Sequence, residues 1–532
     1  MMRVDFGVKP VFNKFAFTIL LTWASVSILA LVAKQLPLLF LHESIAYGDS
    51  YILDGVQNLQ ETGAVYPPLG PDHLVPAIYS PILYGALAAT RWMVRTDNPY
   101  IGPRLLELLW FGGCLYAVGL LTRRLVPEKM ALPGAVLLGL SFATITPWVM
   151  QLRGDFGGIC CALLALFFLL SNKPSGLVWA GLLAGLAVHF KLTFVAAGLA
   201  GCLWLALNRR WADLLRFALT AGVCSVGLYA LAAWREPTIF QHILAMRQII
   251  PHPAGMREFL LRTLMEPVFL FGLLGVVFIL GAIFQRREPG WQLAAIFFFL
   301  SMSIAISTVV QAGAGINYFF EPMFASVPFA VLSLCRMRDR PWGGAGAFAG
   351  VVVLILLIPH AANTLRDLGQ VTDKVALRNQ KYDALGQALN GASVFSAIPD
   401  VTLLLSDRVV MEPLLLNYLV LGRGADLSVL VKRLQMNEFD VVVTQPVDYA
   451  WRGVPSLATD LRRAIIEAYE PRCLLNGVLF HLPKDRPPAS GNAGVGARLE
   501  KLGCKMETCS LGPKCPDLNA KYDQFLGGPP TF

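Results

Sequence analysis

The first sizeable polar stretch of this chain reads Tyr47-Gly-Asp-Ser-Tyr51, then Tyr66-Pro-Pro68 and Tyr79-Ser-Pro-Ile-Leu-Tyr84, and it follows an apolar run. The segment around it carries carboxylates among aromatic and proline residues: Glu43, Asp49, Asp54, Glu61 and Asp72. A polar segment between long apolar runs is typical of a loop at the mouth of a membrane helix bundle. The apolar runs on either side of this loop therefore decide the fold.

The composition supports a membrane protein. The 532 residues are 55% hydrophobic and 15% charged, and the mean hydropathy is +0.57. Such a chain is too apolar for a soluble globular protein of this length. The formal net charge is +9, but the basic residues stand in small clusters between apolar runs and form no basic stripe. We therefore expect a polytopic protein surrounded by membrane lipids, and no nucleic-acid binding.

About eleven apolar runs approach the ~20 residues that a membrane-spanning helix needs. They cover residues 15–34, 104–122, 131–148, 156–171, 176–190, 192–208, 214–233, 267–285, 290–310, 317–335 and 345–362. If the N-terminus is cytoplasmic, the basic clusters between the runs all fall on the cytoplasmic side, as the positive-inside rule requires. Residues 1–362 then form a transmembrane domain, with the first external loop at 35–103. A bacterial inner membrane with a periplasmic or extracellular C-terminal domain fits this arrangement.

One junction could break this alternation of sides. The run from Gly176 to Leu207 is interrupted only by His189-Phe-Lys191. Two halves of ~15 residues are short for a bilayer, whereas one helix of ~48 Å would overshoot a hydrocarbon core of ~30 Å. We expect a short re-entrant hairpin with Lys191 at its outer tip.

The composition changes after the last apolar run. Residues 363–485 alternate polar helical stretches with short apolar strands, which indicates a small extracytoplasmic α/β domain. The expected strands are Ser393–Ser396, Arg408–Met411, Asp440–Thr444 and Gly477–His481, and the expected helices are Leu427–Met436 and Leu457–Tyr469. Residues 486–532 are rich in Gly, Pro and Lys, which predicts a flexible tail that contains cysteines.

The cysteines divide by compartment. Cys473, Cys504, Cys509 and Cys515 belong to the external region, where an oxidising environment permits disulfides. Two bridges are possible, and their pairing does not follow from the sequence. Zinc is the weaker alternative because no CxxC spacing is present. The other cysteines lie within or beside spans, where they act as small apolar residues.

The opening loop contains a candidate for chemistry. Ile52, Val56 and Leu59 recur at helical spacing, which predicts an amphipathic helix from about Ser50 to Glu61. Asp49 lies at or just before the start of that helix, so it is either an N-cap or a functional carboxylate.

More polar residues are expected on the same outer face of the membrane. They are Arg104 and Glu107, Arg153 and Asp155, and the group Asn317, Tyr318 and Glu321. The first two pairs have an alternative interpretation as neutralising ion pairs on one helix or turn. Glu321 lies about one turn inside the membrane, where an ionisable side chain is costly and usually has a partner.

The predicted external segment from Arg235 to Glu266 is unusually rich in arginine. It carries Arg235, Arg247, Arg257 and Arg262, against Glu236, Glu258 and Glu266. The arginines either hold an anionic group, which their planar fork suits, or pair with the glutamates and lipid headgroups. The sequence leaves both interpretations open.

The order of these segments resembles the GT-C membrane glycosyltransferases, nearest to the branch of the protein O-mannosyltransferases and the lipid A aminoarabinose transferase. In the first loop, the resemblance rests on Gly48-Asp-Ser-Tyr51, Asn58-Leu-Gln-Glu-Thr-Gly63, Val65-Tyr-Pro-Pro68 and Tyr79-Ser-Pro-Ile-Leu-Tyr84. Further matches are Arg153-Gly-Asp155, His189-Phe-Lys-Leu-Thr193 and Gly315-Ile-Asn-Tyr318. The resemblance covers about residues 1–362.

The resemblance implies an inverting transfer of a sugar from a polyprenyl-phosphate-linked donor to a glycan, lipid or protein acceptor outside the membrane. It implies a carboxylate of the first loop as general base. Asp49 holds that position, with Glu43 and Asp54 as rivals.

The leaving phosphate of such a transfer needs positive charge beside it. The candidates are, in order, Lys191, Arg153 and Arg257. The other expected substrate contacts are Asp155, Asn317, Tyr318, Glu321, Tyr79 and Tyr84.

Two features depart from the resemblance. Many relatives carry two adjacent acidic residues at the base position, whereas Asp49 stands between Gly48 and Ser50. Oligosaccharyltransferase-like relatives use a divalent metal, but no acidic cluster here predicts one, so neither a metal nor a cofactor is expected. The alternative class is a transporter or flippase for a lipid-linked or envelope substrate. The charges gather at the outer ends of the spans and no internal repeat is evident, which argues against that class.

Overall fold

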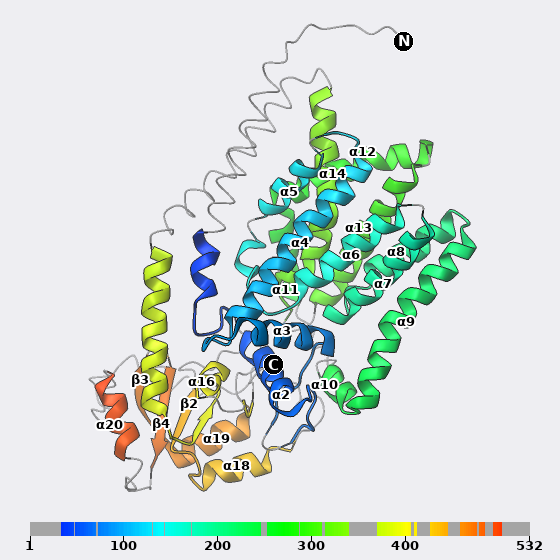
Figure 1. Ribbon diagram of the computed structural model, residues 1–532. Coiled ribbons are helices and arrows are strands. Elements are labelled where there is room, and N and C mark those ends of the chain that lie inside the picture. The colour runs from blue at the N-terminus through cyan, green and yellow to red at the C-terminus, as the bar shows by residue number, and fades with distance from the viewer. Residues whose placement is uncertain are drawn as a thin grey trace.

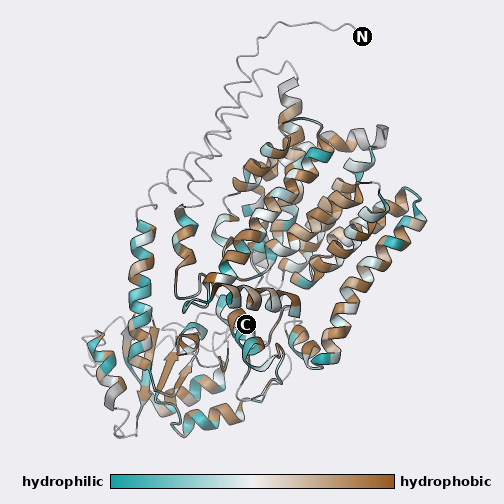
Figure 2. Cartoon of the chain, in the orientation of Figure 1, coloured by the Kyte–Doolittle hydropathy of each residue, from teal (hydrophilic) through white to brown (hydrophobic). Residues whose placement is uncertain are grey.

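The computed structural model describes residues 33–46, 48–70, 73–129, 131–142, 144–171, 173–245, 253–286, 288–310, 314–339, 370–405, 409–411, 416, 426–444, 458–475, 478–484 and 493–502. A bundle of apolar helices stands against a smaller α/β domain, and the polar first loop lies between them (Figure 1). Hydrophobic residues run along the bundle helices, whereas hydrophilic residues are frequent on the helices around the sheet (Figure 2). This confirms the predicted class, a helical polytopic membrane protein with a small C-terminal sheet.

The first loop and the bundle are built from helices joined by short turns. They are α2 (Asp49–Thr62), α3 (Pro81–Val94), α4 (Ile101–Leu125), α5 (Ala131–Leu140), η1 (Thr146–Trp148), α6 (Asp155–Leu169), α7 (Pro174–Phe190), α8 (Ala196–Leu207), α9 (Trp211–Arg235), α10 (Ile239–Ala245), α11 (Pro253–Leu264), α12 (Pro267–Arg286), α13 (Pro289–Val309), η2 (Ile316–Phe319) and α14 (Phe320–Asp339). The expected spans at 15–34 and 345–362 lie almost entirely outside the described residues.

Four of the described helices are long and apolar enough to cross a membrane: Ile101–Leu125, Trp211–Arg235, Pro289–Val309 and Ile316–Cys335. A bent pair, Met256–Leu264 with Val268–Val277, would form a fifth span. Four more helices, α5 to α8, are apolar but shorter. The number of eleven spans therefore stays a prediction. The helix does break at Lys191, where the hairpin tip was expected, and whether this hairpin is re-entrant also stays a prediction.

One expected span is wrong in its extent. The helix predicted for 131–148 ends at Leu140, and the chain continues through a turn into η1. Thr144 donates its backbone N–H to Glu266 Oε1 at 2.7 Å, and its hydroxyl binds the same oxygen. Pro147 lacks the N–H that a continuing helix would use. The side-chain acceptor and the proline together end the helix early.

Small residues let the bundle helices approach closely, which is a common way of packing helices inside membranes. A Cβ atom on Gly157 would lie 2.5 Å from the Phe190 ring, and one on Gly158 would lie 2.2 Å from the Phe194 ring. Helix α6 therefore needs both glycines to pack against the end of α7 and the turn after it.

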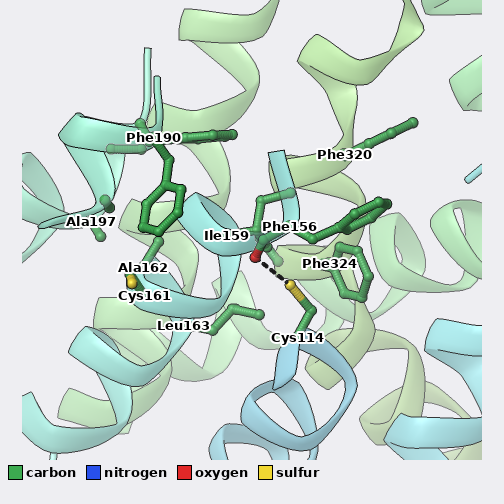
Figure 3. Close-up of a cluster of buried hydrophobic side chains, with 14 of the residues drawn as sticks. Cys114, Phe156, Ile159, Cys161, Ala162, Leu163, Phe190, Ala197, Phe320 and Phe324 are labelled. Atoms are coloured by element: carbon green, nitrogen blue, oxygen red, sulfur yellow. Dashed lines mark hydrogen bonds between the residues drawn. The ribbon is translucent and has the colours of Figure 1, made fainter. Parts of the chain in front are cut away.

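Aromatic contacts join α4, α6 and α14 in the buried cluster of Figure 3. Cys114 Sγ donates to the Phe156 carbonyl oxygen at 2.9 Å. The rings of Phe156 and Phe320 stack with their centroids 5.9 Å apart. These contacts hold the first turns of α6 and α14 together and pack α6 against the middle of α4.

The C-terminal domain is a four-stranded sheet with helices around it. The strands β1 (Val394–Ser396), β2 (Val441–Thr444), β3 (Tyr469–Leu475) and β4 (Val478–Pro483) have the order β1-β2-β4-β3. Only β1 and β2 are parallel. The helices are residues 370–389, α16 (Pro399–Leu404), α18 (Ser428–Gln435), α19 (Thr459–Ala468) and α20 (Ala493–Lys501).

Two details of this domain differ from the expectation. The described part of the predicted strand Arg408–Met411 is not a strand of the sheet, because Met411 forms an isolated bridge with Leu74 of the first loop. The predicted flexible tail, residues 486–532, contains helix α20. Val495 and Leu499 of that helix are buried in the same apolar cluster as Val441 of β2, so ordered structure continues past residue 485.

Several contacts join the C-terminal domain to the first loop, and Asp400 accepts three of their hydrogen bonds. Asp400 Oδ1 accepts the Ser44 backbone N–H at 3.1 Å and the Tyr100 hydroxyl at 2.6 Å, and Asp400 Oδ2 accepts the Ser44 hydroxyl. Asp54 of α2 accepts the Val409 backbone N–H at 3.1 Å. The domain therefore holds the segments on both sides of Asp49.

Candidate active site

The predicted helix of the opening loop is α2, and Asp49 begins it without capping it. Gly48 is the N-cap residue with φ +116°, a conformation that favours glycine, and no side chain caps the helix. Asp49 Oδ2 accepts the backbone N–H groups of Ile45 and Ala46 at 3.2 and 3.3 Å, and Oδ1 accepts that of Leu152 at 3.0 Å. Asp49 is 0% exposed. The carboxylate thus ties its own loop to the turn before α6.

Burial and charge act on Asp49 in opposite directions. Burial raises the pKa of its carboxyl group above the ordinary range, because the ionised form loses its hydration. Arg104 and Arg153 favour the ionised form and pull the pKa back down, as do the accepted backbone N–H bonds. The net shift is upward, which makes Asp49 a stronger proton acceptor when it is ionised.

Arg104 and Glu107 do not neutralise each other, although they are three residues apart on α4. Arg104 donates to the carbonyl oxygens of Leu38 at 3.0 Å and of Leu41 and Glu43 at 2.5 Å. Both Arg104 and Glu107 are 0% exposed, and Glu107 Oε1 accepts the Gly154 backbone N–H at 2.8 Å. Each side chain therefore fixes a loop next to Asp49 instead of forming the expected ion pair.

Four predicted residues meet at the start of α6. Asp155 Oδ1 lies 3.1 Å from Lys191 Nζ, and Asp155 Oδ2 accepts the Asn317 side-chain N–H at 2.8 Å. Lys191 Nζ also lies 3.8 Å from the centre of the Tyr318 ring, a cation–π distance. The lysine is thus held in position on two sides by groups from α6 and η2.

Arg153 belongs to the same region. Its guanidinium lies over the Trp148 ring, 5.0 Å from the centroid. It interacts electrostatically with Asp49, Asp155 and Tyr79, which come from the loop, α6 and the segment before α3. Arg153 therefore interacts both with Asp49 and with the aspartate that pairs with Lys191.

A small pocket opens beside Lys191. Its walls come from the α7–α8 turn, from α13 and from the start of α14, and they include Thr193, Ser301, Thr308, Asn317, Tyr318 and Glu321. Glu321 is 3% exposed, and its Oε1 atom accepts no hydrogen bond within the part of the chain that the structure describes. The pocket therefore combines an ammonium group with a carboxyl group that lacks a donor.

The two predicted tyrosines of the first loop differ in position. Tyr79 is 9% exposed and interacts electrostatically with Arg153 and Asp155, whereas Tyr84 is 0% exposed. The Tyr84 ring packs so closely on α2 that a Cβ on Gly55 would lie 2.6 Å from it. Tyr79 borders the polar cluster, and Tyr84 is a packing residue.

Arg257 lies apart from this cluster. It is exposed on α11, and none of the described contacts joins it to Lys191 or Asp155. Its neighbours Glu258 and Arg262 form an exposed ion pair at 2.6 Å, as the charge-pairing interpretation of this segment expects. Arg247 lies outside the described residues.

Two residues of the same segment support the first loop, a role that sequence reasoning missed. Glu236 Oε2 accepts the backbone N–H groups of Val65 at 2.7 Å and Tyr66 at 2.6 Å. His242 Nδ1 accepts the Ala77 N–H at 2.9 Å, which assigns the proton to Nε2, 2.7 Å from the Pro67 carbonyl oxygen. In the sequence, the only feature that singled out Glu236 and His242 was their place beside the arginines of the predicted external segment.

The described residues contain no group of three or more His, Cys, Asp or Glu side chains that could hold a metal ion. Metal independence stays a prediction. The polar cluster itself offers proton transfer at a carboxylate and binding of an anion at Lys191 and Arg153.

Comparison with known proteins identifies this architecture. A crystal structure of ArnT from Cupriavidus metallidurans superposes with a TM-score of 0.57 at 13% identity, over 88% of this chain and 98% of that one. This is the GT-C fold. An oligosaccharyltransferase of Archaeoglobus fulgidus shares it, with a TM-score of 0.52 at 12% identity over 90% of this chain and 75% of that one. No curated protein sequence matches the chain.

The sequence model of glycosyltransferase family 87 matches residues 77–308. The match contains Tyr79, Arg153, Asp155 and Lys191, and it ends before Glu321 and begins after Asp49. Together with the GT-C fold, it supports a membrane glycosyltransferase.

Proposed function

We propose that this protein is an inverting glycosyltransferase that moves a sugar from a polyprenyl-phosphate-linked donor to an acceptor on the outer face of the membrane. The observation that carries the proposal is the lysine held between Asp155 and Tyr318 at the mouth of a pocket. The family match and the fold support it. ArnT of C. metallidurans has been solved bound to undecaprenyl phosphate, and AglB of A. fulgidus with a dolichol-phosphate and a peptide.

Lys191 is the proposed contact of the donor phosphate. Its side chain is 12% exposed and its ammonium group is held by Asp155 and Tyr318, so its position is set before any ligand binds. A fixed positive charge at the phosphate stabilises the charge that develops when the phosphate leaves. Arg153 supplies a second cation, which interacts with Asp49 and with the aspartate that pairs with Lys191. Arg257 is the weakest of the three candidates because it is exposed on α11.

Asp49 is the proposed general base. In the transfer, the acceptor hydroxyl gives its proton to the carboxylate, its oxygen forms a bond to C1 of the sugar, and the bond from C1 to the phosphate oxygen breaks. The polyprenyl phosphate leaves with the bonding electrons, and the configuration at C1 inverts. Oδ2 of Asp49 accepts two backbone N–H groups and Oδ1 accepts one, so Oδ1 keeps a lone pair for the hydroxyl proton of the acceptor.

The orientation of the chain is part of the proposal. The first loop and the C-terminal domain are bound to each other, so they lie on the same side of the membrane. Cys473 in that domain is disulfide-bonded, which fits an oxidising compartment. We place this side in the periplasm or outside the cell, and the N-terminus in the cytoplasm. Residues 1–362 would form the catalytic domain, and the α/β domain would be a platform for the first loop.

Mass spectrometry of cell-envelope glycans, from cells with and without the gene, tests the proposal. We expect one class of glycan, lipid or protein to lose a single sugar in the deleted strain. Wild-type protein should restore that sugar, and Asp49→Asn should fail to restore it while reaching the membrane in equal amount. Identical glycans in both strains would contradict the assignment as a transferase.

A further inference from the structure

Glu321 brings a carboxyl group into the pocket beside Lys191, with which it interacts electrostatically, and one of its oxygens has no hydrogen-bond donor within the part of the chain that the structure describes. It lies in the first turn of α14 and is 3% exposed. Its Oε1 atom is buried and accepts no hydrogen bond from the residues that the structure describes. A buried acceptor without a donor is unfavourable, and an ionisable group at this depth in a membrane protein usually serves a site.

Two hydroxyl groups that line this pocket beside Glu321, those of Ser301 and Thr308, do not supply the missing donor. Ser301 Oγ donates to the Phe298 carbonyl oxygen at 3.0 Å, and Thr308 Oγ1 donates to the Ile304 carbonyl oxygen at 2.6 Å. Each hydroxyl has only one proton, so both present acceptor lone pairs to the pocket. The chemical complement of this wall is therefore a ligand group that donates hydrogen bonds.

The part of the lining that Lys191 contributes has the reverse character. Lys191 Nζ is fixed by Asp155 and by the Tyr318 ring and borders the same pocket. A phosphate suits the ammonium group, whereas the buried oxygen of Glu321 suits a hydroxyl group that donates a hydrogen bond. A ligand that satisfies both parts of the lining carries an anion and a neighbouring hydroxyl group.

We propose that Glu321 accepts a hydrogen bond from a hydroxyl group of the donor sugar and so selects donors that carry it. The inference rests on the proposed function, because it needs the donor phosphate at Lys191. The sugar is bonded to that phosphate through C1, which brings the hydroxyl groups near C1 within reach of the pocket. A site built to bind a hydroxyl group discriminates strongly against a sugar that lacks it, because its buried acceptor is then left unpaired.

Binding to the full-length protein in lipid nanodiscs tests the inference. The probes are undecaprenyl phosphate without a sugar and undecaprenyl phosphate linked to glucose, mannose or galactose. The variants are Glu321→Gln, Glu321→Ala and Lys191→Ala. We expect both Glu321 variants to bind the sugar donor that the wild type prefers at least about tenfold more weakly than the wild type does. Their affinity for sugar-free undecaprenyl phosphate should stay within about twofold of the wild-type value.

Lys191→Ala should bind all the probes more weakly, with and without a sugar, because it removes the phosphate contact. The inference is overturned if the Glu321 variants lose as much affinity for sugar-free undecaprenyl phosphate as for the sugar donor. Glu321 would then act on the phosphate through Lys191. It is also overturned if they bind every probe like the wild type. If Lys191→Ala leaves all binding unchanged, the proposed phosphate site itself is wrong. Retained binding of sugar-free undecaprenyl phosphate shows that a variant is folded.

Discussion

Asp49 Oδ1 accepts the backbone N–H of Leu152 at 3.0 Å, a bond that joins two segments 103 residues apart in the chain. It holds the first loop against the turn that carries Arg153 and leads into α6 at Asp155. The same hydrogen bond therefore positions both the proposed base and the turn that carries Arg153, a proposed donor-binding residue. A substitution at Asp49 tests two roles at once, and the two must be separated by experiment.

Asp49→Asn should abolish transfer while the protein still folds. A general base contributes roughly 10²–10⁴ in rate, so the initial rate at saturating donor should fall at least about a hundredfold. The asparagine side chain keeps the size of aspartate and one acceptor oxygen. Because burial raises the pKa of Asp49, the wild-type rate should also rise with pH across a range above that of an ordinary carboxyl group. Initial rates and thermal melting of the same preparation check both statements.

Asp54→Asn is the matched control for that variant. Asp54 lies on the same helix, is 3% exposed and also accepts a backbone N–H, from Val409 at 3.1 Å. It should lose a similar amount of thermal stability and keep most of its transfer rate. If the rates of the two variants fall in proportion to their stability, Asp49 supports the loop and is not the base.

Lys191→Ala should raise the donor KM, or lower donor binding, by at least about tenfold, since a hydrogen bond to a charged group contributes about 1.5–3 kcal/mol. Arg257→Ala is the control, because Arg257 is exposed on α11. It should change donor binding by less than about twofold, as surface substitutions usually do. An equal loss of donor binding in both variants would mean that Arg257, in the arginine-rich segment, also contacts the donor phosphate. Titration of the donor against each purified variant measures the difference.

Local periodicity predicted the elements of the site more reliably than their contacts. The spacing of Ile52, Val56 and Leu59 predicted both ends of helix α2 to within about one residue. The apolar residues on the buried face of a helix recur at helical spacing, and this pattern is visible in the sequence. Strand β3 was missed because Pro471 and Arg472 interrupt its apolar pattern. The strand is held by its pairing with β4, which local sequence does not show.

The role of Arg104 shows why contacts are harder to predict. Its spacing from Glu107 suggested an ion pair on one helix. In the folded chain the guanidinium instead binds the carbonyl oxygens of Leu38, Leu41 and Glu43, more than sixty residues earlier. A loop that folds over a helix end offers backbone acceptors that no sequence pattern reveals. The meeting of Lys191, Asp155 and Asn317 was expected only as a shared outer location, and the distances required the fold.

Asp400→Ala should weaken the attachment of the C-terminal domain to the first loop, which other contacts such as Arg378–Glu43 and Asp54–Val409 still hold. The change removes the acceptor of the Ser44 backbone N–H, the Ser44 hydroxyl and the buried Tyr100 hydroxyl, and should cost about 3 kcal/mol of stability. Asp383→Ala is the control, since its pair with His42 has side chains that are 38% and 49% exposed and contributes at most about 1 kcal/mol. Thermal melting and limited proteolysis compare the two. Equal shifts in melting temperature would show that Asp400 is not the main attachment.

His481 should make the C-terminal domain less stable as the pH falls. Burial lowers its pKa from 6.5 to about 3, and its Nε2 lies 2.8 Å from Thr444 Oγ1 across β2 and β4. Between pH 6.5 and about pH 3, His481 takes up a proton in the unfolded chain but not in the folded domain. The free energy of unfolding therefore falls by up to about 1.4 kcal/mol for each unit by which the pH is lowered. His481→Gln should melt with a weaker dependence on pH between 7.5 and 5. The other histidines titrate in both proteins, so the difference between the two melting curves isolates His481. Parallel curves would mean that His481 can take up a proton in the folded domain.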